Sequence, residues 1–130
     1  MAEPLTASCH CGAVRITLRR RPRSLTSCNC SICRRYGAIW AYYARKGLVY
    51  DYAPDAVAPY TWGNGHIEFF HCTRCGSVTH YERTKKQGDA TRVGVNVRLV
   101  DPAALDGIPL RRPDGAGGWK TLRRWKHRWA

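Results

Sequence analysis

The sequence of 130 residues lacks any apolar stretch long enough to span a membrane as a helix. Its first residues, Met1 to Thr6, contain no apolar h-region, so we expect no secretory signal and a cytoplasmic protein. The sequence shows no internal repeat and no second domain. These absences favour one domain with a modest core, small enough to gain stability from bound metal ions.

The cysteines do not suit a disulfide framework, because seven is an odd number and one thiol would be left over. Cys28, Cys30 and Cys33 are three thiols within six residues, and two further pairs have the spacings C-x-C (Cys9, Cys11) and C-x-x-C (Cys72, Cys75). A closed structural zinc site has four protein ligands, whereas a catalytic site keeps three and an open position. The seven thiols therefore divide most economically into a closed set of four and an open set of three, and we predict two zinc ions per chain in a reducing compartment.

Acidic residues are scarce: nine Asp and Glu stand against 22 Lys and Arg, which gives a formal net charge of +13. Such an excess predicts an anionic partner, either a small acidic substrate or nucleic acid. The basic run Arg19 to Arg23 is most simply a solvated turn, with a phosphate contact as the alternative. No membrane partner is expected, and the oligomeric state is left open.

Short alternating or aromatic segments predict a mainly β fold made of short antiparallel sheets. The segment around Cys9 and Cys11 is expected to be extended, so that both side chains share one face. Asp101-Pro102 is typical of a helix start. The predicted strands are Val14 to Leu18, Ala38 to Tyr43, Leu48 to Tyr52, Val57 to Trp62, His66 to His71, Val78 to Tyr81 and Arg92 to Arg98.

The end of the chain differs in composition, which divides the sequence into a zinc domain at residues 1–110 and a basic, Trp-rich extension at residues 111–130. Trp119, Leu122, Trp125 and Trp129 recur at helical spacing and predict a short basic C-terminal helix. Its tryptophans either dock on the same domain or contact nucleic acid. We favour docking, because exposed tryptophan stripes are rare on soluble proteins.

Four segments resemble the glutathione-dependent formaldehyde-activating enzyme family, which also includes centromere protein V. The resemblance implies a β-tent fold with two zinc ions. It assigns a structural zinc to Cys9, Cys11, Cys72 and Cys75, and a catalytic zinc to Cys28, Cys30 and Cys33. The matching segments are Cys9 to Arg15, Cys28 to Arg35 with Gly37, Phe70 to Gly76, and Val95 to Leu99 with Asp101-Pro102.

The family resemblance implies carbon–sulfur lyase or synthase chemistry on a thiol adduct of a small carbonyl compound, of the S-hydroxymethylglutathione type. A substrate thiol, possibly glutathione, suits a three-thiolate zinc because soft ligands favour sulfur. Arg34 and Arg35 are predicted substrate contacts, with a solvated charge pair as the equal alternative. Trp40, Tyr42 and Tyr43 either line a pocket beside this zinc or pack in the core, and core packing is the default expectation.

No general base is evident in the sequence. His10 and His71 flank cysteines but should point away from the metal, and His66, His80 and Glu68 are more typical of ordinary strand residues than of proton shuttles. The alternative function is a non-catalytic, zinc-stabilised binding module that contacts nucleic acid through its basic surface and tail. The open position at the three-cysteine cluster separates the two hypotheses, because a binding module does not need one.

Overall fold

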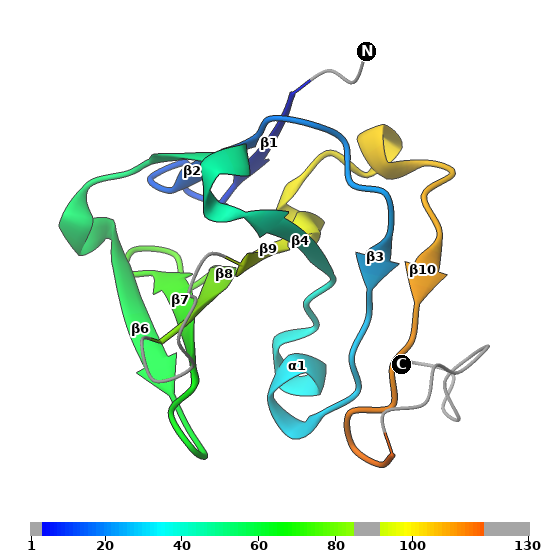
Figure 1. Ribbon diagram of the computed structural model, residues 1–130. Helices are drawn as coiled ribbons and strands as arrows, with labels where there is room; N and C mark the ends of the chain where they lie inside the picture. Colours follow the sequence, from blue (N-terminus) through cyan, green and yellow to red (C-terminus); the bar gives the residue numbers. More distant parts are fainter. Residues whose placement is uncertain (1–3, 85–91, 119–130) are drawn as a thin grey trace.

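The structure is a computed structural model that describes residues 4–84 and 92–118. In these ranges the chain is mainly β, with two sheets and one short α-helix, as the sequence predicts (Figure 1). The strands are β1 (Leu5–Ser8), β2 (Arg15–Leu18), β3 (Leu25–Thr26), β4 (Trp40–Ala44), β5 (Leu48–Asp51), β6 (Val57–Thr61), β7 (Ile67–Cys72), β8 (Val78–Arg83), β9 (Arg92–Asn96) and β10 (Leu110–Arg111). The helices are α1 (Ser31–Tyr36) and the 3-10 helices η1 (Arg45–Gly47), η2 (Pro54–Ala56), η4 (Val97–Leu99) and η5 (Pro102–Leu105).

One sheet has three strands in the order β1-β2-β5, and the other has seven in the order β10-β3-β4-β9-β8-β7-β6. Figure 1 shows the small sheet at the top of the view and α1 at the lower end of the molecule. All strand pairs are antiparallel except β3 with β10, which are parallel. The predicted mainly β fold of short antiparallel sheets is confirmed, and β3 with β10 adds one parallel pair between segments far apart in the sequence.

The main core lies between the two sheets. Along β4, Ala41 and Tyr43 face this core, while Trp40 and Tyr42 point to the other side of the large sheet. Val93 and Val95 of β9 also face the core, which leaves Gly94 between them on the side of Tyr42. This alternation follows from the period of two in a strand. It fixes which side chains can reach the functional site.

One local prediction needs correction. Cys9 to Gly12 form a turn rather than an extended segment: the Gly12 N–H donates to the Cys9 carbonyl at 3.0 Å, and Gly12 has φ +82°. The three-cysteine segment runs into α1, which is followed by the capping residue Gly37 with φ +64°. Glycine adopts this left-handed conformation without a steric penalty, so it ends the helix.

The predicted helix start at Asp101 is confirmed as η5, where the Asp101 carboxylate accepts a hydrogen bond from the Ala103 N–H at 3.1 Å. The expected boundary after residue 110 falls inside β10, which pairs with β3. Farther on, Asn29 Nδ2 donates to Asp114 Oδ1 at 2.8 Å, so the beginning of the extension packs beside the three-cysteine segment. The predicted C-terminal helix, with Trp119, Trp125 and Trp129, lies outside the described residues. No helix within the described ranges is long and apolar enough to cross a bilayer.

Candidate metal centres and the adjoining pocket

Four cysteine sulfurs from two distant segments meet at one point. Cys9 and Cys11 come from the turn after β1, and Cys72 and Cys75 come from the end of β7 and the knuckle after it. Cys11 Sγ lies 3.7 Å from Cys9 Sγ and 3.6 Å from Cys72 Sγ. Four sulfurs placed tetrahedrally at about 2.3 Å from zinc would be separated by ~3.8 Å. The observed spacing therefore fits a four-thiolate zinc site.

Backbone amides around this cluster point at the sulfurs. The Val14 N–H donates to Cys9 Sγ at 3.2 Å, and the Arg74 N–H donates to Cys72 Sγ at 3.4 Å. The Ser77 hydroxyl lies 3.3 Å from Cys75 Sγ, and its hydrogen bond lowers the pKa of Cys75 to about 5. Such donors stabilise thiolates, which is the form of cysteine that binds metals.

Cys28, Cys30 and Cys33 form the second cluster, with sulfurs within 4.8 Å of one another. Cys28 and Cys30 lie between β3 and α1, whereas Cys33 sits on α1 and is buried. The Cys30 N–H donates to Cys28 Sγ at 3.5 Å. In the described part of the chain no fourth Cys, His, Asp or Glu ligand joins this group.

The three thiols of this cluster titrate together. Hydrogen bonds from Cys28 and Cys33 lower the pKa of Cys30 to about 2, and hydrogen bonds with the neighbouring thiols raise the pKa values of Cys28 and Cys33. A zinc ion would favour ionisation of all three, so the donor set fits a soft divalent metal with an open position.

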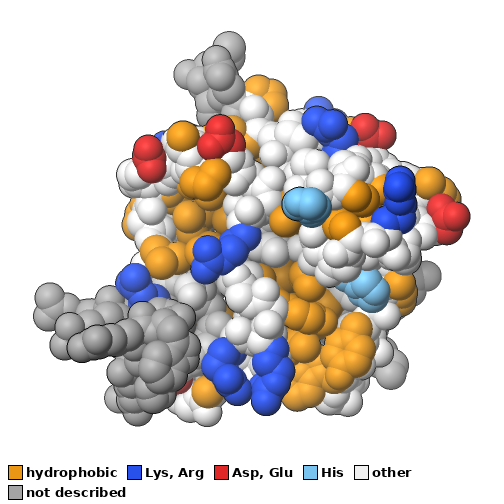
Figure 2. Space-filling model, turned by 180° about the vertical axis from the view of Figure 1, so that it is seen from behind, with side chains coloured by type: hydrophobic (Ala, Val, Ile, Leu, Met, Phe, Trp, Pro, Cys, Tyr) orange, Lys and Arg blue, Asp and Glu red, His pale blue; other side chains and the backbone are white. Residues whose placement is uncertain are grey.

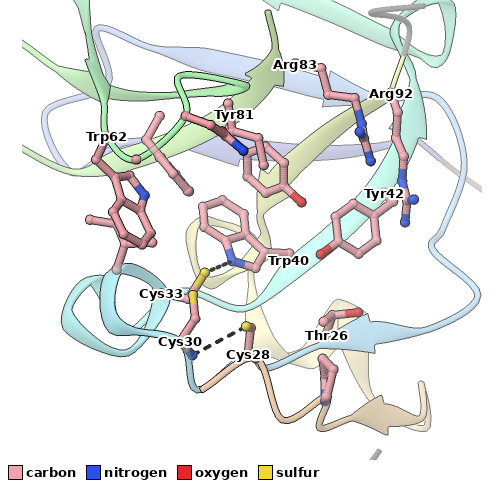
Figure 3. Close-up of a pocket in the computed structure, with 17 residues that line it drawn as sticks. Thr26, Cys28, Cys30, Cys33, Trp40, Tyr42, Trp62, Tyr81, Arg83 and Arg92 are labelled. Atoms are coloured by element: carbon pink, nitrogen blue, oxygen red, sulfur yellow. Dashed lines mark hydrogen bonds between the residues drawn. The ribbon is translucent and has the colours of Figure 1, made fainter. Parts of the chain in front are cut away.

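The cluster opens into a cavity of about 520 Å³ (Figure 3). The lining residues are Thr26, Cys28, Cys30, Ile32, Cys33, Trp40, Tyr42, Trp62, Gly63, Asn64, Ile67, Phe69, Tyr81, Arg83, Arg92, Pro113 and Gly115. A volume in this range, with mostly apolar walls and a few polar groups, is typical of small-molecule sites. The sulfurs lie at one end of this cavity.

Of the three aromatic residues expected either to line a pocket or to pack in the core, two line the pocket and one packs in the core. Trp40 and Tyr42 line the pocket, and the Trp40 indole Nε1 donates to Cys33 Sγ at 3.4 Å. Tyr43 faces the opposite side of the sheet, where it is buried and its hydroxyl donates to the Arg20 carbonyl at 2.9 Å. The strand alternation of residues 40–43 decides this outcome.

Tyr81 completes the aromatic wall across the sheet. Gly94 pairs with Tyr42 on one side and with Tyr81 on the other, and the Tyr81 ring lies over the glycine. A Cβ at Gly94 would sit 2.3 Å from Tyr81 Cε2, so only glycine leaves room for the ring. The Tyr81 ring packs edge-on against Trp40, with centroids 4.8 Å apart.

Arg34 and Arg35 are not among the residues that line the pocket. Both lie in the last turn of α1, and Arg35 donates from its guanidinium to the Ser31 carbonyl at 3.0 Å. Positive charge at this end complements the helix dipole. Their role as substrate contacts stays a prediction.

The sequence analysis missed the two arginines that do line the pocket, Arg83 and Arg92. Arg92 lies over the Tyr42 ring, 4.2 Å from its centroid. The period of two along β8 places Tyr81 and Arg83 on one face, a signal that the sequence contains. That face could be identified as the pocket side only once the strand order was known.

None of the other predicted polar residues joins either cysteine cluster in the described ranges. His10 is exposed in its turn, and no histidine in the described ranges joins either group of sulfurs. His80 is fully buried behind the pocket wall, where it stacks on Phe70 with ring centroids 4.7 Å apart. Burial lowers the pKa of His80 to about 3, so it is neutral at physiological pH.

Comparison with known proteins agrees with this arrangement. No curated protein matches the chain. Among solved structures, the crystal structure of a Rhodobacter sphaeroides protein, a structural genomics target, is 32% identical, with a TM-score of 0.65, and the match covers 81% of this chain and 98% of the other. The family model described as glutathione-dependent formaldehyde-activating enzyme matches residues 4–106. The chain therefore belongs to the glutathione-dependent formaldehyde-activating enzyme family.

Proposed function

We propose that the protein is a zinc-dependent carbon–sulfur lyase or synthase that joins a thiol to a small carbonyl compound, or releases it, in the manner of S-hydroxymethylglutathione. The observation that carries this proposal is the three-sulfur cluster of Cys28, Cys30 and Cys33 at the wall of a ligand-sized pocket. A purely structural zinc would need a fourth ligand and would not need a pocket. The family membership supports the same reaction class.

In this proposal the two clusters have different roles. Cys9, Cys11, Cys72 and Cys75 hold a structural zinc, which joins the turn after β1 to the end of β7. Cys28, Cys30 and Cys33 would hold the catalytic zinc, which would supply positive charge that favours ionisation of a substrate thiol. Free cysteines in all seven positions agree with a reducing, cytoplasmic location.

Two tyrosine hydroxyls in the pocket wall are suited to donate hydrogen bonds to the carbonyl oxygen of the substrate. The hydroxyls of Tyr42 and Tyr81 lie between the sulfurs and the arginines in Figure 3. Burial raises the pKa of both tyrosines, so both remain protonated donors at neutral pH. As the carbon–sulfur bond forms, the carbonyl oxygen gains negative charge that these hydroxyls stabilise. The proton lost by the thiol ends on that oxygen, and the reverse transfer releases thiol and carbonyl compound.

The extension at residues 111–130 belongs to the same domain in this proposal, because its beginning already contacts Asn29 beside the cluster. The alternative function, nucleic-acid binding, depends on the tail outside the described residues and stays a prediction. Steep loss of oligonucleotide binding with added salt would be its signature.

The test measures exchange between free formaldehyde and its glutathione adduct by NMR, with zinc-loaded full-length protein. We expect exchange faster than the uncatalysed rate, and we expect Cys30→Ser to abolish this acceleration while the protein remains folded. Ser24→Ala, at a half-buried position directly before β3 and outside the cavity lining, is the control and should not change the rate. Exchange at the uncatalysed rate, with two zinc ions bound per chain, would contradict the proposed function.

A further inference from the structure

Two arginines come together at the end of the pocket away from the sulfurs. Arg83 is the last residue of β8 and Arg92 is the first residue of β9. These strands are antiparallel neighbours in which Glu82 pairs with Val93, so Arg83 and Arg92 occupy the next facing position. Both side chains line the cavity, and Figure 3 shows them beyond Tyr42 and Tyr81 as seen from the cysteines. An anion bound between two guanidinium groups would accept charge-assisted hydrogen bonds from both of them.

The charge of the cavity wall favours an anion at this end. No Asp or Glu is among the described residues that line the pocket. The Arg92 guanidinium is held over the Tyr42 ring, 4.2 Å from its centroid, which fixes its position and still leaves its edge for hydrogen bonds. Basic side chains also border the apolar patch on the face shown in Figure 2.

Much of the remaining lining is apolar. Trp40, Trp62, Ile67 and Phe69 contribute ring and aliphatic surface to it, and Trp62 is 48% exposed at the surface. The rings of Tyr42 and Tyr81 lie between the sulfurs and the arginines in Figure 3. The cavity volume of about 520 Å³ is far larger than a formaldehyde unit requires. The ligand must therefore place apolar surface against this wall.

We propose that Arg83 and Arg92 form an anion-binding subsite, and that the ligand of this pocket is an apolar thiol with a carboxylate at its far end. The thiol end of this assignment rests on the proposed function, whereas the carboxylate end rests on the arginines alone. Glutathione has carboxylates that the arginines can bind, but it offers little apolar surface and its ammonium group would find no acidic partner among the described lining residues. An apolar monocarboxylate thiol should bind more tightly than glutathione.

The experiment compares matched probes by isothermal titration of the zinc-loaded, full-length protein. The first pair is 6-mercaptohexanoate and 6-mercaptohexanol, which differ at the far end only. The second pair is hexanoate and hexanol, which lack the thiol. Hydrogen bonds to charged groups are stronger than those between neutral groups. We therefore expect each carboxylate to bind at least about tenfold more tightly than the matching alcohol. We also expect 6-mercaptohexanoate to bind more tightly than glutathione.

Variants locate the subsite. Arg83→Gln and Arg92→Gln should each reduce the preference for the carboxylate, and the double variant should remove it. Arg83→Lys and Arg92→Lys keep the charge and should retain part of the preference, which separates loss of charge from loss of folding. The matched control is Arg15→Gln, an exposed position on β2 in the other sheet, which should retain the full preference.

Equal binding of the acid and the alcohol, or a preference that survives in the folded double variant, would overturn the proposal. The two proposals can fail separately. Carboxylate-dependent binding of hexanoate without any acceleration of adduct exchange would leave the subsite standing and contradict the proposed function. Accelerated exchange that is equally fast with both mercaptohexyl compounds, together with equal binding of both, would leave the proposed function standing and contradict the subsite.

Discussion

The Trp40 indole N–H donates a hydrogen bond to Cys33 Sγ at 3.4 Å, and both groups are buried. Trp40 is fixed on β4 and Cys33 on α1, so this contact ties the cysteine helix to the large sheet. A donor to a ligating sulfur also reduces the negative charge on it and orients it. The tryptophan therefore acts on the three-cysteine cluster as well as on the pocket wall.

Replacing Trp40 with Phe should weaken zinc binding at the three-cysteine cluster by about tenfold to a hundredfold, because the sulfur loses its donor. Competition with a chromophoric chelator measures this affinity, and the four-cysteine site should be unchanged. Trp62→Phe is the matched control, since no hydrogen bond from Trp62 to a sulfur is present in the described structure. Equal affinities in the two variants would show that the indole N–H does not support the cluster.

The two zinc sites should differ in their effect on stability. Cys75→Ser breaks a site that joins segments about 60 residues apart, as the 61-residue separation of Cys11 and Cys72 shows. Its zinc contributes folding free energy on the order of 10 kcal/mol, so this variant should not fold stably. Cys30→Ser affects only its own segment and should melt near the parent temperature. Similar melting losses for both would mean that the clusters do not divide into structural and catalytic roles.

Gly94→Ala should damage the pocket selectively. The added methyl group would meet the Tyr81 ring at 2.3 Å, so the ring must leave its place between Trp40 and Tyr42. Overpacking of this kind typically costs about 1–3 kcal/mol of stability, and we expect adduct exchange to fall with it. Gly47→Ala is the control, because its Cβ would lie 3.7 Å from Tyr43 Cδ1, an ordinary contact. A Gly94→Ala protein with parental stability and rate would contradict this account of the wall.

Tyr42→Phe and Tyr81→Phe test the hydroxyls. Loss of a hydrogen-bond donor to developing negative charge typically lowers kcat on the order of a hundredfold. We expect the double variant to show at least this loss, with KM for the thiol and zinc content unchanged, because the rings still shape the pocket. If the folded, zinc-loaded double variant keeps its kcat, the phenols do not assist the carbonyl oxygen.

His80 should make the fold sensitive to acid. Its pKa is lowered from about 6.5 to about 3 by burial and then by Arg45, while the unfolded chain keeps the ordinary value. Between these values the unfolded state binds the extra proton, so stability is complete above about pH 6.5 and falls as the pH is lowered towards 3. Glu82, 3.8 Å from His80 Nε2, is too distant to offset the burial.

Denaturant melts between pH 7 and 5.5, with zinc content measured at each pH, should show this loss of stability. His80→Gln removes the titrating group and should flatten the dependence, even if its stability at pH 7 is lower. Asp106→Asn, at an exposed position directly after η5, should keep the parental slope. A parental slope in His80→Gln would assign the acid sensitivity to other groups.

The sequence by itself determined the metal-binding sets and most strands of this protein. Cysteine spacing is local, so C-x-C followed by C-x-x-C brings Cys28, Cys30 and Cys33 together in any compact arrangement of their segment. Strand alternation is local as well, and it explains why Trp40 and Tyr42 face one side of the sheet and Tyr43 the other, although the sequence analysis treats the three together. The resemblance to the family was carried by the same short segments.

The tertiary structure alone decided which side chains face the sulfurs. Arg83 and Arg92 meet because β8 and β9 are neighbours, and Tyr81 reaches Tyr42 only across Gly94. The parallel pairing of β3 with β10 likewise joins segments that no local pattern connects. Strand order depends on the packing of the whole chain, whereas periodicity and spacing report only what lies within a few residues. For that reason the sequence located the cysteine clusters, and the fold defined the pocket beside one of them.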